Sequence, residues 1–368
     1  MKIKISISIE LHLNKFKEEV MKKGLVLVLV VLLAVSMMFA GCAKESAAKD
    51  GADTAAGDDA TESVLKALEG ETYYMVTFAS EHPYWVDVLE GYTKALELYG
   101  AEVKYTGTIG ADVAEQVTLI EQIITKQPAG IAIAAANAEG IVPVIEEAVE
   151  AGITVVNFDA ASAPAEGLHG FIGTGNYNAG VVAAHEMAAL LGESGKCGVV
   201  TVIDTDSTRN RGEGFIDTIT NEYPNMEIVQ VVDGAFDQQI SAEVTSAMLQ
   251  NNSDIVGVFT SFAAGGVGVA TAIEENGMEG KIEVISFDTN AGLLDLIKDG
   301  KVSGTMAQGT WVMGWEAGHH AFWQHHNLLQ PKPNWEENGI SPTPANIDTG
   351  ISFVTAETAD LYYPVEAE

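Results

Sequence analysis

From Thr72 onward the chain alternates short apolar runs with longer stretches in which apolar residues recur at helical spacing. Val113, Val117, Ile120 and Ile124, for example, follow the spacing of one buried helix face. The short runs show little alternation of polar and apolar positions, which is typical of parallel strands covered by helices on both faces. In the first half this pattern predicts strands at 73–78, 103–105, 131–135 and 153–158, and helices at 84–98 and 141–149.

The second half repeats the rhythm. Its strands are predicted at 197–203, 228–232, 255–259 and 282–287, and its helices at 212–221, 238–250, 266–276 and 291–298. Successive βαβ units require parallel sheets with right-handed crossovers. We therefore predict an α/β fold of two doubly wound parallel-sheet lobes. Such sheets bind ligands outside the carboxyl ends of their strands, so the residues just after each strand are the candidates for a site.

The N-terminal segment has the pattern of an export signal. A basic start at Met21-Lys-Lys precedes an apolar run that closes on Phe39-Ala-Gly-Cys42. A cysteine directly after Ala-Gly resembles a bacterial lipobox, in which the signal is cut before the cysteine and the cysteine carries lipid. We expect residues 1–41 to be a signal peptide, with translation starting at Met21, and Cys42 to anchor the protein to the outer face of the cell membrane. An ordinary signal peptide that happens to contain a cysteine is the alternative.

Composition and charge narrow the function further. Residues 43–63 are rich in Ala, Asp, Gly and Ser, so we expect a flexible tether over 42–70. The net charge of −33 disfavours nucleic acid as a partner, because an acidic surface repels phosphate backbones. Apart from Cys42, which we expect to carry lipid, Cys197 is the one cysteine of the mature chain, so no internal disulfide can form, and its apolar strand predicts a buried thiol.

Aromatic, acidic, amide and arginine side chains follow the predicted strands. This mixture suits a neutral polyhydroxylated ligand, because sugar C–H faces stack on aromatic rings while carboxylates accept and arginine donates hydrogen bonds. Each phenylalanine could instead belong to the core, and each aspartate could instead cap a helix. The candidate ligand-binding residues are His82, Tyr84, Trp85, Asp159, Arg211, Phe236, Phe262, Asp288 and Gln308.

These segments resemble the type 1 periplasmic sugar-binding proteins of ABC importers, of the ribose-binding kind. The resemblance covers roughly residues 72–355 and is carried by Pro83-Tyr-Trp85, Phe158-Asp159, Arg211-Gly-Glu-Gly-Phe215, Phe236-Asp237, Phe287-Asp288 and Gln308. It implies a monomeric binder without a cofactor or a bound metal. It also implies closure about a three-stranded hinge, and delivery of the sugar or polyol to a membrane permease with its ATPase.

Three positions depart from the ribose-binding pattern. Ala160 stands where that pattern has arginine, and Phe262 and His82 stand where it has asparagine. The loss of polar contacts favours a deoxygenated, methylated or larger sugar, or a polyol, over ribose. An autoinducer-2-like ligand fits the same fold, and coupling to a membrane sensor instead of a permease is the alternative function.

The resemblance also implies where the lobes divide. The chain is expected to cross between them near 173–176, 308–309 and 346–350. The first lobe then comprises 71–173 plus 309–345, and the second comprises 174–308 plus 346–368.

Other signals point away from an enzyme. The chain shows no phosphate-binding loop and no nucleophile–base pair, and the glycines of 173–180 have the wrong spacing for a dinucleotide loop. His319, His320, His325 and His326 are not at the i, i+4 spacing of helical metal pairs, so we interpret them as a solvated helix face. Trp311, one turn before Trp315, either packs in the core or borders the ligand site.

Overall fold

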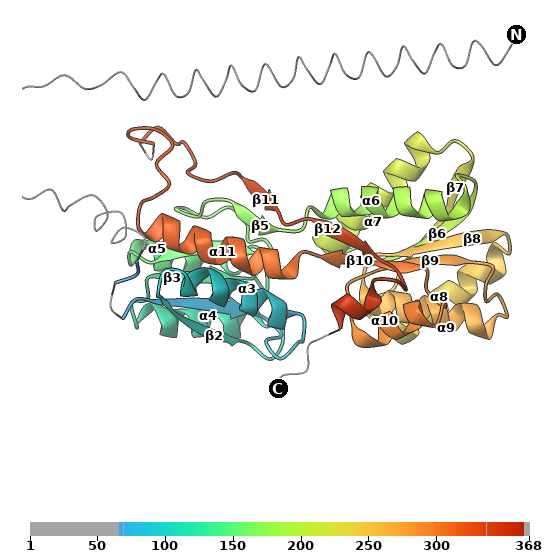
Figure 1. Cartoon of the computed structure of the whole chain (residues 1–368), viewed down its shortest axis with the longest axis horizontal. Helices are drawn as coiled ribbons and strands as arrows, with labels where there is room; N and C mark the ends of the chain where they lie inside the picture. Colours follow the sequence, from blue (N-terminus) through green and yellow to red (C-terminus); the bar gives the residue numbers. More distant parts are fainter. Residues whose placement is uncertain (1–65, 69, 336, 364–368) are drawn as a thin grey trace, which may run out of the picture. The chain divides into compact units, whose positions relative to one another are not determined.

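The computed structural model describes residues 66–68, 70–335 and 337–363. The predicted signal peptide, Cys42 and most of the predicted tether lie outside these residues. The described part of the chain contains two six-stranded sheets (Figure 1). We call each sheet with its helices a lobe. The two-lobed α/β fold predicted from the sequence is confirmed.

The first sheet has all six strands parallel. Its spatial order is β11 (Asn346–Asp348), β5 (Phe171–Gly173), β4 (Thr154–Phe158), β3 (Gly130–Ile133), β1 (Thr72–Thr77) and β2 (Glu102–Gly107).

The second sheet repeats this order, but its edge strand β12 runs antiparallel to β10. Its strands are β12 (Ile351–Val354), β10 (Gly304–Gln308), β9 (Glu283–Phe287), β8 (Ile255–Thr260), β6 (Gly195–Thr201) and β7 (Met226–Asp233). Because the two orders match, equivalent strands of the two lobes end in equivalent places.

Helices cover both faces of the first sheet. Alternate residues of β1 divide between two cores: Tyr73 and Met75 pack with α3 and α11, whereas Tyr74 and Val76 pack with α4 and α5. This two-sided burial explains the apolar character of the strand at every position. The four helices are α3 (Trp85–Glu97), α4 (Val113–Ile124), α5 (Val142–Glu150) and α11 (Thr310–His325).

The second sheet is covered in the same way. Cys197 and Val199 pack toward α6 and α7, whereas Val200 packs toward α8, α9 and α10. The Cys197 thiol is fully buried, as predicted, and burial raises its pKa to about 12. The elements are α6 (Asn176–Leu191), α7 (Asp206–Glu222), α8 (Gln238–Asn251), α9 (Ala263–Glu275), α10 (Ala291–Lys298) and a short 3₁₀ helix η1 (Ala359–Tyr362).

The chain passes between the sheets three times. It leaves the first sheet after β5, at Thr174–Gly175, and returns after β10, at Gly309. It crosses again between β11 and β12, at Thr349–Gly350. Residues 346–348 pair with β5, so the first sheet extends three residues beyond the boundary expected from the sequence.

Helix α7 begins earlier than its apolar pattern suggested. Its first turn, from Asp206, is polar and lacks helical periodicity, so the sequence indicated only its second half. Gly214 on this helix touches α6: a Cβ at this position would lie 2.0 Å from the carbonyl oxygen of Tyr177. The glycine therefore lets α6 approach closely the helix that carries Arg211.

The predicted stripe on α4 is wrong in part. Val113 and Val117 are only partly buried, and Gln116 is fully buried in their place. The Gln116 amide donates to the carbonyl of Ala134 at 2.8 Å and accepts from the amide of Ala136 at 2.9 Å. Both ends of the side chain are satisfied, which makes its burial tolerable.

The prediction of a solvated histidine face on α11 is wrong for two of the four histidines. His319 and His320 are only 8% and 7% exposed. Helix α11 packs along α3, which lies beside it in Figure 1, and its aromatic residues enclose these rings. His319 hydrogen-bonds Tyr99 at 2.5 Å and stacks on Trp323. The sequence offered no sign of this because α3 lies more than two hundred residues away.

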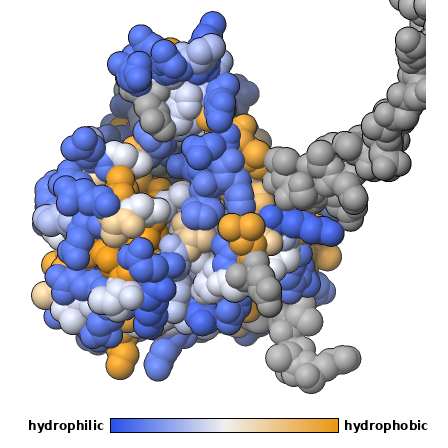
Figure 2. All heavy atoms as spheres, turned by 90° about the vertical axis from the view of Figure 1, so that its left-hand side faces the viewer, coloured by the Kyte–Doolittle hydropathy of each residue, from blue (hydrophilic) through white to orange (hydrophobic). Residues whose placement is uncertain are grey.

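The exposed face at one end of the first lobe is mainly hydrophilic, with apolar residues in small patches (Figure 2). This surface agrees with the strongly acidic composition of the chain. Among the described residues, no helix combines the length and the apolar character that crossing a membrane requires.

Candidate functional site

Two aspartates occupy equivalent positions in the two lobes. Asp159 follows Phe158 at the end of β4, and Asp288 follows Phe287 at the end of β9. Both have left-handed backbones, with φ of 56° and 64°. Each donates its amide to the neighbouring strand at 2.9 Å, to Ile172 in one case and Met306 in the other. Each lobe therefore carries a carboxylate at the same strand end and on the same backbone geometry.

Tyr84 contacts the carboxylate of the first lobe. It lies just before α3, and its hydroxyl donates to Oδ1 of Asp159 at 2.6 Å. Burial, followed by the charge of Asp159 and the hydrogen bond to it, raises the pKa of Tyr84 well above its usual value. Tyr84 therefore acts as a neutral hydrogen-bond donor beside this carboxylate.

Arg211 is the cation of the site and is only 7% exposed. Its Nε donates to Oδ1 of Asn176 at 2.8 Å, and its Nη1 donates to the carbonyl of Ser261 at 3.1 Å. The guanidinium carbon lies 3.9 Å from the centre of the Phe287 ring. These contacts fix the plane of the guanidinium and leave further N–H donors for a ligand.

Asp288 is held by the next strand of its sheet. Gln308 at the end of β10 donates from Nε2 to Oδ1 of Asp288 at 2.7 Å. The Gln308 carbonyl accepts from the hydroxyl of Thr174, also at 2.7 Å. The Gln308 amide therefore orients one carboxylate oxygen of Asp288. Gln308 is itself hydrogen-bonded to Thr174, in a segment that crosses between the lobes.

The charges of the two lobes act on one another. Burial raises the pKa of Asp159 to about 6, although the Tyr84 hydrogen bond and Arg211 both lower it, and Asp288 raises it further. Burial lowers the pKa of Arg211, while Asp288, Tyr84 and Asp159 raise it. Tyr84 and Asp159 of the first lobe thus lie within electrostatic reach of Arg211 and Asp288 of the second.

The aromatic candidates divide between core and surface. Trp85 is 3% exposed and donates its indole N–H to the carbonyls of Phe78 and Ala79, so it supports Tyr84 from the core. Phe262 is also 3% exposed and lies in the core of the second lobe. Phe236 is 52% exposed, in edge contact with Phe262.

His82 lies at the surface beside the tyrosine. Its Nδ1 accepts the backbone amide of Tyr84 at 3.1 Å, which shapes the turn before α3. The structure thus joins His82 to Tyr84 through the backbone, and it shows no bond from His82 to Asp159 or Arg211 among the described residues.

Sequence reasoning missed three residues that hold this site together. Asn176, Thr174 and the carbonyl of Ser261 all position candidate residues. Asn176 and Thr174 belong to the glycine-containing segment 173–180, which the sequence indicated only as a crossing. Three side chains of types that can ligate a metal, Glu71, His325 and His326, also come together in the described chain, but none is among the nine candidates.

Comparison with known proteins identifies the family. Residues 73–322 match the model described as periplasmic binding protein domain. The chain belongs to the periplasmic binding protein family. The prediction of a binding protein instead of an enzyme is thereby confirmed.

Several relatives of this periplasmic binding protein are named for sugars. It is 26% identical over 249 residues to the D-ribose/D-allose-binding protein of Pseudomonas aeruginosa, covering 65% of this chain and 75% of that protein. It is 41% identical to the structure of AraP, an arabinose-binding protein from Geobacillus stearothermophilus, with a TM-score of 0.76 over 80% of this chain and 100% of that one. A sugar-binding protein of a sugar ABC transporter from Bacillus halodurans is 40% identical, with the same TM-score and coverage.

Proposed function

We propose that this protein is the extracytoplasmic sugar-binding component of an ABC importer and that it binds a monosaccharide between its lobes. The observation that carries the proposal is the convergence of Tyr84 and Asp159 from one lobe with Arg211 and Asp288 from the other. The similarity to sugar-binding proteins supports the same conclusion.

The donor and acceptor set favours a neutral polyol over a charged ligand. Two carboxylates accept hydrogen bonds from hydroxyl groups, and the free N–H groups of Arg211 donate to hydroxyl or ring oxygens. A phosphate or carboxylate ligand would meet Asp159 and Asp288 at close range, which the single arginine does not offset. Tyr84 adds an aromatic face on which the C–H face of a sugar ring can lie.

Among monosaccharides we favour arabinose first. The Geobacillus relative that shares 41% identity is an arabinose-binding protein. Ala160 follows Asp159 without offering a polar side chain, and the buried Phe262 offers none either, so two polar contacts of the ribose-binding pattern are absent and ribose is disfavoured. Hexoses and polyols are therefore also included in the thermal-shift measurements that test this choice.

Hinge closure is the proposed mechanism. The three crossings touch one another: the amide of Thr349 donates to the carbonyl of Gly173 at 3.0 Å, and the amide of Gly309 donates to Gly350 at 3.3 Å. The carboxylate of Asp348 accepts from the amide of Gly175 at 3.0 Å. Such adjoining segments can bend together, so that ligand contacts from both lobes favour the closed state. A permease with its ATPase would then recognise the closed form.

We also propose that lipid on Cys42 holds the exported protein at the membrane, with the segment up to residue 70 as a tether. The support is the lipobox-like Phe39-Ala-Gly-Cys42 and the composition that follows it. Wild-type protein should enter the detergent phase on phase separation, and the Cys42→Ala protein should stay in the aqueous phase. Equal partitioning of the two proteins would refute the anchor without affecting the sugar site.

A thermal-shift panel tests the binding function. Protein lacking the signal segment is heated with pentoses, hexoses, polyols and autoinducer-2, each in turn. We expect arabinose or another monosaccharide to raise the unfolding temperature, with a further rise for each tenfold increase in its concentration above Kd, because a ligand that binds only the folded state stabilises it. No shift with any sugar would overturn the proposal, and a shift with autoinducer-2 alone would replace the sugar by that signal.

A further inference from the structure

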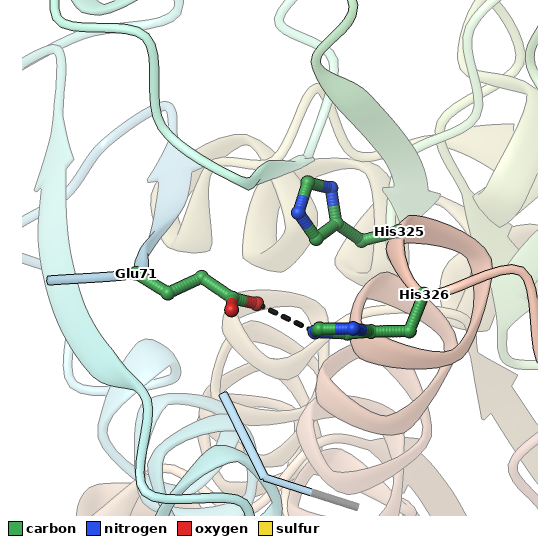
Figure 3. A group of neighbouring side chains, drawn as sticks. All are labelled: Glu71, His325 and His326. Atoms are coloured by element: carbon green, nitrogen blue, oxygen red, sulfur yellow. Dashed lines mark hydrogen bonds and ion pairs between the residues drawn. The ribbon is translucent and has the colours of Figure 1, made fainter. Parts of the chain in front are cut away.

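The C-terminal end of α11 brings two histidines to the residue that precedes β1. Candidate ligand atoms of Glu71, His325 and His326 all lie within 4.8 Å of one another. Figure 3 shows the Glu71 carboxylate reaching toward the two imidazoles, which come from consecutive residues of the chain. Glu71 Oε1 lies 2.9 Å from Nε2 of His326. The site therefore joins two segments that are more than 250 residues apart in sequence.

We propose that Glu71, His325 and His326 bind a divalent transition-metal ion of the zinc type. Two imidazoles and one carboxylate are the protein ligands of several zinc sites, and a water molecule supplies the fourth position of a tetrahedron. Ligand atoms in such a site are about 3.3 Å apart, given metal–ligand bonds of about 2.0–2.1 Å. The Glu71–His326 pair needs to open by only a few tenths of an ångström to admit the ion.

The surroundings hold the carboxylate in place. The Tyr73 hydroxyl donates to Oε1 of Glu71 at 2.5 Å, and the amide of Leu68 donates to Oε2 at 2.6 Å. The Glu71 side chain is 5% exposed, and that of His326 is 19% exposed. Outer hydrogen bonds of this kind orient the ligands of a metal and raise its affinity.

The second imidazole has an unused lone pair. Within the described part of the chain, no hydrogen bond of the His325 ring is found, although the ring lies edge-on to Tyr73 and to His326. The hydrogen bond between Glu71 and His326 does not explain why the His325 ring also lies beside the Glu71 carboxylate. A shared metal ion would explain that position.

The choice of ion follows from the ligands. Imidazole nitrogen favours Zn²⁺, Cu²⁺ and Ni²⁺, whereas Mg²⁺ and Ca²⁺ prefer sites made only of oxygen. A bound ion would fasten the start of β1 to the end of α11. Because no residue of the sugar site takes part, this inference stands apart from the proposed function.

Zinc titration of the chelator-treated protein, freed of any histidine tag, tests the proposal. We expect one Zn²⁺ per chain by calorimetry and a zinc-dependent rise in unfolding temperature, with no such effect from Mg²⁺. His325→Ala and His326→Ala should each weaken zinc binding at least tenfold. His185→Ala, which removes an exposed histidine of α6, should leave it unchanged.

Two results would overturn the site: no stoichiometric zinc binding by the wild-type protein, or equal binding by the wild type and both variants. Circular dichroism checks that each variant is folded. If His326→Ala fails to fold because its bond to Glu71 is lost, His325→Ala decides the question, since no hydrogen bond of that ring is found among the described residues.

Discussion

Thr174 and Gln308 hydrogen-bond each other at 2.7 Å across two of the segments that join the lobes. Each residue directly precedes a glycine at which the chain crosses between sheets, Gly175 and Gly309. Gln308 also donates to Asp288 at 2.7 Å. A ligand that shifts the Asp288 side chain would therefore also shift the crossing segments, through the side-chain amide of Gln308.

Replacing this amide should weaken sugar binding. Gln308→Leu removes the donor to Asp288 and the acceptor for Thr174, leaving both without these partners. Because a lost hydrogen bond to a charged group costs about 1.5–3 kcal/mol, we expect affinity to fall roughly 10- to 100-fold in calorimetry. Gln239→Leu, on the exposed surface of α8, should bind as the wild type does. Wild-type affinity in Gln308→Leu would remove Gln308 from the site.

Sugar affinity should fall as the pH drops through about 6. The pKa of Asp159 is raised to about 6, chiefly by burial, so this carboxylate is ionised above that pH and protonated below it. Protonation turns one carboxylate oxygen into a donor and removes the stronger, charge-assisted hydrogen bonds, so we expect binding about tenfold weaker at pH 5 than at pH 7.5. Calorimetry at the two pH values measures the difference.

Two variants separate this effect from histidine titration. Asp159→Asn should bind weakly at both pH values and lose the dependence. His82→Gln should keep it, because within the described residues the hydrogen bond found for the exposed His82 ring goes to the backbone amide of Tyr84 and not to Asp159. A pH dependence that disappears in His82→Gln and persists in Asp159→Asn would contradict the assignment.

The contact between α6 and α7 should not tolerate a side chain. In Gly214→Ala the new methyl would meet the carbonyl oxygen of Tyr177 at 2.0 Å, so we expect a loss of about 1–3 kcal/mol in the free energy of unfolding by urea. Gly292→Ala is the matched control, because a Cβ there has nothing within 4 Å and the residue lies in α10. It should be neutral or slightly stabilising. Equal stability of the two variants would show that the helices separate freely.

Acid should destabilise the first lobe through His320. Burial, with a smaller contribution from the charge of His319, lowers the pKa of His320 to about 4, whereas an unfolded histidine titrates near 6.5. The unfolded state therefore binds more protons between these values, and the stability that is present above pH 6.5 is lost as the pH falls toward 4. Between pH 7 and 5 the loss amounts to about 2 kcal/mol from this group.

Urea unfolding at pH 7 and pH 5 measures this loss. His320→Phe should lose less stability than the wild type over the interval, and His185→Ala should lose as much as the wild type. An identical pH dependence in His320→Phe and the wild type would show that the buried imidazole does not resist protonation.

The sequence indicated those parts of the fold and site that depend on local pattern. Strand ends are recognisable from where an apolar run stops, so Asp159 and Asp288 could each be named as a candidate before their matching geometry was known. Contacts between segments that are distant in sequence cannot be recognised from the local pattern. Asn176 supports Arg211 from another helix, and His319 is buried by the aromatic side chains around α11. A buried polar residue whose hydrogen bonds are satisfied, such as Gln116, is also not indicated by a pattern of apolar positions.

Arg211 is the buried cation of the proposed sugar site, within electrostatic reach of Asp159 and Asp288, and one titration tests its role most directly. Wild-type protein lacking the signal segment is titrated with arabinose by calorimetry, beside Arg211→Ala and the control Arg209→Ala, whose arginine pairs at the surface with Asp206 and Glu213. We predict one sugar per chain for the wild type and for Arg209→Ala, with binding at least tenfold weaker in Arg211→Ala. Sugar binding of equal strength in all three proteins would contradict the account.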